Sequence, residues 1–95
     1  MIEIEKIRGM GEYRKEKNRY LVPENGKVFL VINKNTIEVR TDERLGKLLV
    51  EKYESVMRSR YFGRGGIEVV DSGQLEKAEL EDLIRLSYNL TKEII

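Results

Sequence analysis

Five consecutive apolar residues, Val28-Phe29-Leu30-Val31-Ile32, constrain the fold of this chain more than any other feature. A strand with one face in water alternates apolar and polar residues, whereas an unbroken apolar run is typical of a strand buried on both faces. Asn25-Gly26 precedes the run and is the strongest short-range signal for a β-hairpin. Asn33-Lys34-Asn35 follows it, and asparagine tolerates the left-handed conformation of a turn. The run therefore predicts a central strand in an antiparallel meander.

The segments on either side supply partners for this strand. Tyr20-Leu21-Val22 precedes the Asn-Gly turn and is stopped by Pro23, the only proline. Thr36-Ile37-Glu38-Val39-Arg40 follows the second turn and alternates. We expect its two apolar residues to face the core and Glu38 and Arg40 to face water.

Two helices are predicted in the rest of the chain. Thr41 or Asp42 can cap a helix that runs to about Arg60, because side-chain oxygens accept from the free amides of a first turn. Its apolar face, at three-and-four spacing, consists of Leu45, Leu48, Leu49, Tyr53, Val56 and Met57. Ile67-Glu68-Val69-Val70 is expected to be a strand, and Lys77 to about Ile94 a second helix with acidic residues in its first turns.

The secondary structure of the N-terminal part is the hardest to predict. Ile2, Ile4 and Ile7 suit either a short strand or the start of a helix, and we favour a strand that ends before Gly9 and Gly11. The charged segment from Glu12 to Arg19 suits a solvated loop or a strand edge. The order from there is β-β-β-α-β-α, with an uncertain N-terminal element. We expect residues 1–95 to form a single compact α+β domain, an antiparallel β meander with two helices packed on one face.

The composition excludes several classes of function. The 95 residues include no cysteine and no histidine, which removes disulfides, thiolate sites, the commonest metal ligand and the usual general base near neutral pH. We therefore expect neither an enzyme nor a cofactor nor a small-molecule substrate. No apolar run is long enough to span a bilayer, so we expect a cytoplasmic protein without membrane contact. The high content of Lys and Glu fits a thermostable, archaeal protein.

Charge is distributed unevenly along the chain. Residues 1–67 hold 15 basic and 10 acidic side chains, and residues 68–95 hold 3 and 7, so the net charge of +1 divides into +5 and −4. A basic surface can face nucleic acid or an acidic partner. The same division would favour self-association.

The loop Arg60-Tyr61-Phe62-Gly63-Arg64-Gly65-Gly66 is the best candidate for a site. Exposed aromatic and guanidinium groups stack on bases and bind phosphates, and glycine permits close approach of the backbone. In the alternative interpretation Gly63 simply ends the preceding helix and both rings pack into the core. The candidate nucleic-acid-binding residues are Arg58, Arg60, Tyr61 and Arg64 of this region and Arg14, Lys15, Lys17 and Arg19 of the N-terminal charged segment.

The other motifs are weaker evidence for a functional site. The glycines follow a predicted helix, whereas a nucleotide-binding fingerprint follows a strand and opens a helix. Glu79 and Asp82 share a helix face and could bridge a hard cation, but acidic residues in a first turn already have a capping explanation. Ser72 has no histidine to activate it. We therefore expect no catalytic residues and no metal site.

Several segments resemble those of a known family. Gly26-Lys27-Val28-Phe29, Gly66-Ile67-Glu68-Val69 and the final Leu80-Glu81-Asp82-Leu83-Ile84-Arg85-Leu86-Ser87-Tyr88 occur in an order similar to that of the YjbR/MmcQ family. Arg8-Gly9-Met10-Gly11 before a Gly-Lys-Val-Phe strand also resembles the opening of the TfoX N-terminal domain. The resemblance implies a small α+β fold for which DNA binding has been suggested, with no established catalytic site.

Two functional hypotheses follow. The first is a non-enzymatic binding module associated with nucleic acid through the basic aromatic loop. The second is a protein-interaction or homodimerisation module, in which Leu90, Ile94 and Ile95 contribute apolar surface.

Overall fold

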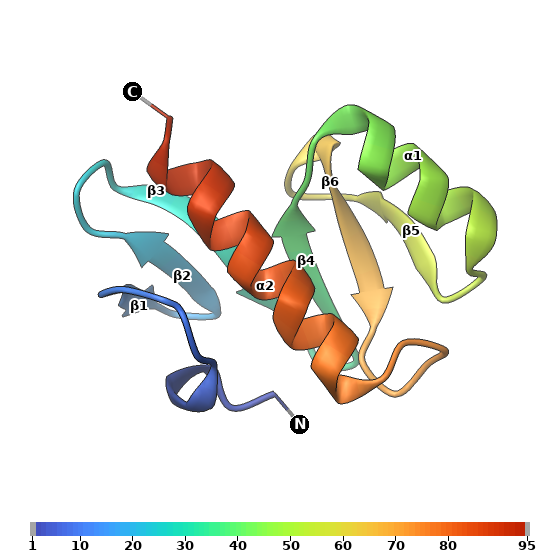
Figure 1. Ribbon diagram of the computed structural model, residues 1–95, viewed down its shortest axis with the longest axis horizontal. Coiled ribbons are helices and arrows are strands. Elements are labelled where there is room, and N and C mark those ends of the chain that lie inside the picture. The colour runs from blue at the N-terminus through green and yellow to red at the C-terminus, as the bar shows by residue number, and fades with distance from the viewer. Residues whose placement is uncertain (1, 95) are drawn as a thin grey trace.

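The computed structural model describes residues 2–94; Ile95, named above for an interface, lies outside them. The elements follow in the order η1 (a 3₁₀ helix, Ile4–Lys6), β1 (Arg14–Glu16), β2 (Arg19–Val22), β3 (Lys27–Ile32), β4 (Thr36–Arg40), α1 (Glu43–Lys52), β5 (Val56–Ser59), β6 (Gly63–Val70) and α2 (Lys77–Lys92). The strands form one antiparallel sheet in the order β1-β2-β3-β4-β6-β5. Both helices lie on the same face of this sheet (Figure 1). The predicted α+β class and the position of the two helices are thereby confirmed.

The main core lies between the sheet and the helices. Phe29, Ile37 and Ile67 from the sheet and Leu80 and Ile84 from α2 are at most 2 % exposed. β3 is buried along almost its whole length, as its unbroken apolar run predicts. A smaller apolar cluster of Leu21, Val28 and Val31 lies apart from this core, on the face that no helix covers.

A β-bulge in β3 explains how α2 is held on the sheet. Pairing advances by one residue on β2 but by two on β3, so Phe29 is the extra residue. The β3–β4 ladder ends with the pair Leu30–Val39, one step before Phe29 would meet Arg40. Ser87 of α2 fills this gap: its Oγ donates to Phe29 O at 2.6 Å and accepts from Arg40 N at 2.7 Å. One hydroxyl therefore satisfies two backbone groups of the central strands.

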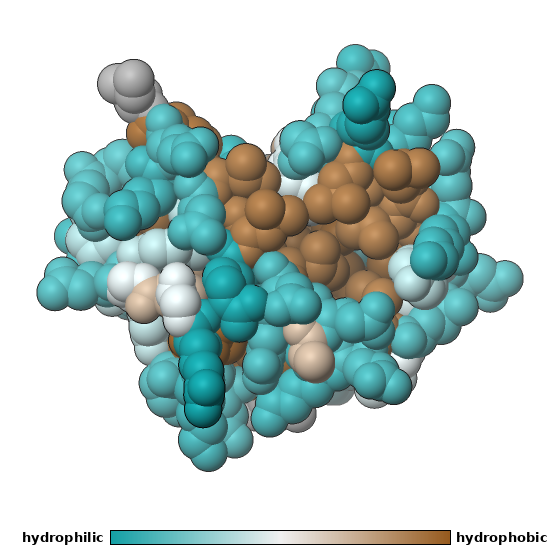
Figure 2. Space-filling model, viewed as in Figure 1, coloured by the Kyte–Doolittle hydropathy of each residue, from teal (hydrophilic) through white to brown (hydrophobic). Residues whose placement is uncertain are grey.

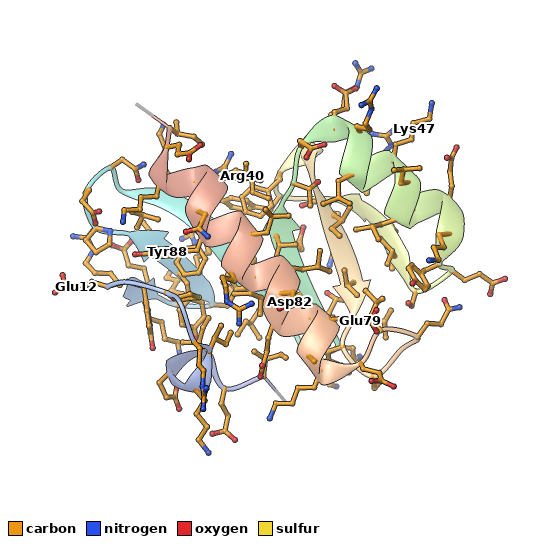
Figure 3. The ribbon with its side chains drawn as sticks, in the orientation of Figure 1. Glu12, Arg40, Lys47, Glu79, Asp82 and Tyr88 are labelled. Carbon is orange, nitrogen blue, oxygen red and sulfur yellow. The ribbon has the colours of Figure 1, made fainter. Side chains whose placement is uncertain are left out.

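The β2–β3 turn also reaches α2. Gly26 has a φ of +69°, the left-handed conformation that a Gly allows there. The Asn25 amide donates to Thr91 O at 2.8 Å and to Ile94 O at 3.0 Å, which caps the carbonyl end of the helix. The N-terminal segment contacts the same helix, where the Tyr88 hydroxyl donates to Glu12 O at 2.8 Å (Figure 3).

Three details of the predicted secondary structure are wrong. The first helix ends at Lys52 rather than near Arg60, because Tyr53 is extended, and the next residues form β5 so that Val56 can be buried against β6. Residues 4–6 form a 3₁₀ helix where a strand was expected, with Ile4 buried. Gly63 is not a helix stop: with a φ of +60° it follows the turn between β5 and β6 and begins β6. The sheet thus gains two edge strands, β5 and β1, the second within the segment predicted to be a loop or a strand edge.

Candidate functional site

The face of the sheet that no helix covers, called here the helix-free face, has an unusual central row of side chains. Directly paired residues on neighbouring antiparallel strands point to the same face. A continuous series of such pairs crosses all six strands and consists of Glu16, Arg19, Val31, Glu38, Glu68 and Met57. Two carboxylates therefore lie next to each other at the centre of the face.

Both carboxylates are buried, although Glu38 was predicted to face water. Glu38 and Glu68 are each 3 % exposed, because the β5–β6 turn folds back over this part of the sheet. Glu38 accepts from the Ser59 hydroxyl at 2.7 Å and from the Tyr61 backbone N–H and the Asn33 amide at 2.9 Å. Burial acts to raise the pKa of Glu38, but these hydrogen bonds outweigh it and lower the pKa below its ordinary value.

Glu68 is held by a guanidinium group. Arg60 donates to its two carboxylate oxygens through Nε at 2.9 Å and Nη2 at 2.7 Å, and the Thr36 hydroxyl donates at 2.7 Å. The hydrogen bonds from Arg60 are the largest cause of the lowered pKa of Glu68, and they raise the pKa of Arg60. The outer part of Arg60 stays in water, since its side chain is 75 % exposed. Arg60 thus fixes the turn to the sheet and still presents positive charge.

The two rings of the turn have different surroundings. Phe62 is half-buried against the Leu21, Val28 and Val31 cluster, with the Arg40 guanidinium 4.8 Å from its centroid. Tyr61 is 46 % exposed and meets the Phe62 ring edge-on, with centroids 4.9 Å apart. One ring therefore packs on the sheet, as the alternative interpretation predicted for both, while the other is presented to solvent.

Gly66 makes this arrangement feasible. A Cβ at this position would collide with the backbone oxygen of Val39 and would lie 2.7 Å from Cβ of Phe62. The glycine at 66 therefore allows the turn to lie against the sheet.

An open hollow of about 380 Å³ lies beside Tyr61 on the helix-free face. Its walls are formed by Arg19 and Val31 of the sheet, Asn18 and Asn33 of the turns, Glu38, Arg60 and Tyr61. Two arginines, two amides and an exposed phenol ring thus surround one shallow space. The turn residues and the N-terminal charged segment meet here through Arg60, Tyr61 and Arg19.

The other predicted site residues lie elsewhere. Arg14 points to the helix-free face through its pairing with Leu21, and it contacts Glu16 at 3.7 Å. Arg58 and Arg64 line a separate hollow of about 160 Å³ beside α1. Lys15 and Lys17 line a third hollow, of about 350 Å³, on the N-terminal side of the sheet. The eight candidates therefore do not form one surface.

Sequence reasoning missed the polar residues under the turn: Asn33, Thr36, Glu38, Ser59 and Glu68. Ser59 falls in the stretch predicted to be helical, and the others belong to strands or turns, where an alternating pattern assigns polar residues to water. Only the pairing of β4 with β6 brings them together, and the register of that pairing leaves no signal in the sequence.

Within residues 2–94, no group of three or more side chains of the metal-binding types is gathered in one place. In the same part of the chain, neither helix has the length and apolar character that crossing a membrane requires.

The fold defines an α+β protein with a six-stranded antiparallel sheet, two helices on one face and an open opposite face. No family model and no curated protein matches the chain. A solved structure does: the chain is similar to a protein from Pseudomonas syringae known by its crystal structure, with a TM-score of 0.67 and 19 % sequence identity over 88 % of this chain and 80 % of the other. The similarity at this identity concerns the fold.

Proposed function

We propose that this chain is a non-enzymatic module that binds single-stranded nucleic acid on its helix-free face. The observation that carries the proposal is the exposed ring of Tyr61, which lines an open hollow together with Arg60 and Arg19. An aromatic face for a base and two guanidinium groups for phosphates are the two elements that single-strand binding uses.

The ring of Tyr61 is held in place before any ligand arrives. Its backbone N–H is bonded to Glu38 at 2.9 Å, its neighbour Arg60 is bonded to Glu68, and its ring contacts Phe62. A base that stacks on this ring would therefore lose little binding free energy to the ordering of the loop. The side chain of Asn18 lines the same hollow, and beyond its bond to Asn33 its amide group can donate to or accept from a base edge.

The charges of the two buried carboxylates are partly compensated. Glu68 is offset by Arg60, and Glu38 accepts three hydrogen bonds. Among the described residues Arg19 forms no ion pair, so its charge is available to a phosphate. The resemblance of the sequence to the YjbR/MmcQ family, for which DNA binding has been suggested, supports the same proposal.

The test is fluorescence anisotropy with a labelled single-stranded oligonucleotide at low salt. We expect binding that weakens steeply with salt, because phosphate contacts release counterions. Tyr61→Ala should weaken it by about tenfold, since a stacked base contributes roughly 1–3 kcal/mol. Arg19→Glu should weaken it strongly.

Arg64→Glu is the matched control, because it makes the same change of charge at an exposed arginine that lines a different hollow. The proposal fails if no binding is seen at low salt, or if Arg64→Glu weakens binding as much as Arg19→Glu. Preference for a duplex of the same sequence would also contradict it, since the base faces that stack on Tyr61 are hidden in a duplex.

A further inference from the structure

We infer that the groove between α1 and α2 is a dimer interface, and that a second copy of this chain occupies it about a two-fold axis parallel to the helices. This inference concerns the face opposite to the proposed nucleic-acid interface and does not depend on it. Figure 2 shows apolar side chains gathered in a hollow between the two helices, above the sheet. The hollow has a volume of about 250 Å³.

The apolar surface continues out of the hollow onto both helices. Leu49, Tyr53, Leu83 and Leu86 line the hollow itself. Leu48 on α1 is 58 % exposed, and Leu86 on α2 is 37 % exposed. A continuous apolar patch on a small protein marks an interaction surface more often than isolated exposed leucines do.

The charges beside this patch differ between the two helices. Residues four apart lie on one side of a helix, and the exposed stripe of α1 consists of Arg44, Leu48 and Lys52. On α2, residues three or four apart form the facing stripe of Glu79, Asp82, Leu86 and the half-buried Leu90, followed by Glu93 one residue beyond the end of the helix. One wall of the groove is therefore basic at both ends and the other acidic at both ends, with a leucine near the middle of each.

The two helices run antiparallel, and this determines which residues of α1 in one copy lie opposite which residues of α2 in the other. Leu49 and Tyr53, from the C-terminal end of α1, line the hollow together with Glu79 and Asp82 from the N-terminal half of α2 (Figures 1 and 3). A two-fold axis parallel to the helices places α1 of one copy over α2 of the other without reversing the direction along the groove. Lys52 then meets Glu79 and Asp82 of the second copy.

The other pairs follow from the same axis. Leu48 lies over Leu86 of the second copy, and Arg44 lies near its Glu93. Every pair occurs twice, as in any isologous dimer. A basic amphipathic helix from another protein would match α2 but would be repelled by Arg44 and Lys52, and an acidic one would be repelled by α2. The second copy matches both walls, and for this reason we assign it as the occupant.

Sedimentation velocity from low micromolar to millimolar concentration tests the inference. We expect a reversible monomer–dimer equilibrium. Leu48→Glu should raise the dimer dissociation constant by at least about tenfold, because it places a carboxylate in the apolar centre of the interface. The side chain is mostly in water in the monomer, so the variant should keep its circular dichroism spectrum and its thermal midpoint.

Met57→Glu is the matched control. It makes the same kind of change at a residue 40 % exposed on the helix-free face, and it should leave the dissociation constant unchanged. Lys52→Glu should weaken the dimer, and the double variant with Asp82→Lys should restore it, although Asp82→Lys alone loses a contact with Arg85. A monomer at every concentration, equal effects of Leu48→Glu and Met57→Glu, or a double variant weaker than either single variant would each overturn the inference.

Discussion

The hydroxyl of Ser87 offers the most direct test of how this fold is held together. Ser87→Ala removes one oxygen from a fully buried side chain and leaves both Phe29 O and Arg40 N without the bonds measured at 2.6 and 2.7 Å. A buried donor or acceptor left unsatisfied costs about 1–3 kcal/mol. The better helix propensity of alanine returns roughly 0.5 kcal/mol. Two such groups, less this gain, should lower the free energy of unfolding by about 1.5–5.5 kcal/mol.

This loss is large for a chain of this size, because a small domain has a free energy of unfolding of roughly 5–15 kcal/mol. Urea denaturation followed by circular dichroism measures it. With a slope of about 1–3 kcal/mol per molar urea, the midpoint should fall by at least roughly 0.5 M. Ser72→Ala is the control: Ser72 lies in an exposed turn, so the midpoint should change little. A loss below about 1 kcal/mol for Ser87→Ala would refute the reasoning, since it would show that the two backbone groups find other partners.

Three further predictions concern the turn over the sheet and the end of α2. Because Glu38 and Glu68 have lowered pKa values in the folded state, they stabilise it above their unfolded pKa of about 4.3, and this contribution is lost as the pH falls through the folded values. The urea midpoint should therefore drop steeply below about pH 4.5, and this drop should be smaller in Glu38→Gln. A midpoint that stays constant down to about pH 3 would contradict this reasoning. Gly66→Ala should displace the turn and destabilise the fold by about 1–3 kcal/mol, because the new methyl group collides with the backbone of Val39; an unchanged thermal midpoint would disprove the close contact. Asn25→Ala should cost about 1 kcal/mol and speed amide exchange in the last turn of α2, because two carbonyls lose their donor; unchanged exchange there would exclude the capping role.

The fold was predictable where local chemistry decides it. The apolar run of β3, the Asn25-Gly26 turn and the capping of α1 by Asp42 each have a local cause, and each is present in the structure. The end of α1 was not predictable in this way. Val56 and Met57 continue the helical spacing without a glycine or proline, and only pairing with β6 draws them into a strand.

The candidate site likewise contains residues that the sequence indicated and residues that it did not. The composition of the turn drew attention to Arg60 and Tyr61, and the structure places both beside one hollow. The role of Glu38 could not be read from its sequence, because burial of that carboxylate depends on a turn that lies 23 residues further along the chain. Alternation describes a strand with one wet face, and here a folded-back turn covers part of that face.

The contacts of α2 have a consequence for how the protein folds during synthesis. This helix leaves the ribosome after all six strands, yet Ser87 completes the centre of the sheet and Asn25 of an early turn bonds to the end of the helix. A nascent chain that lacks α2 would expose the apolar residues of β3 and β4 on one face and would have a gap between these strands. Contacts so distant in sequence also slow folding. We therefore expect the sheet to close only after α2 has been made, so that nascent chains without α2 stay accessible to chaperones and proteases.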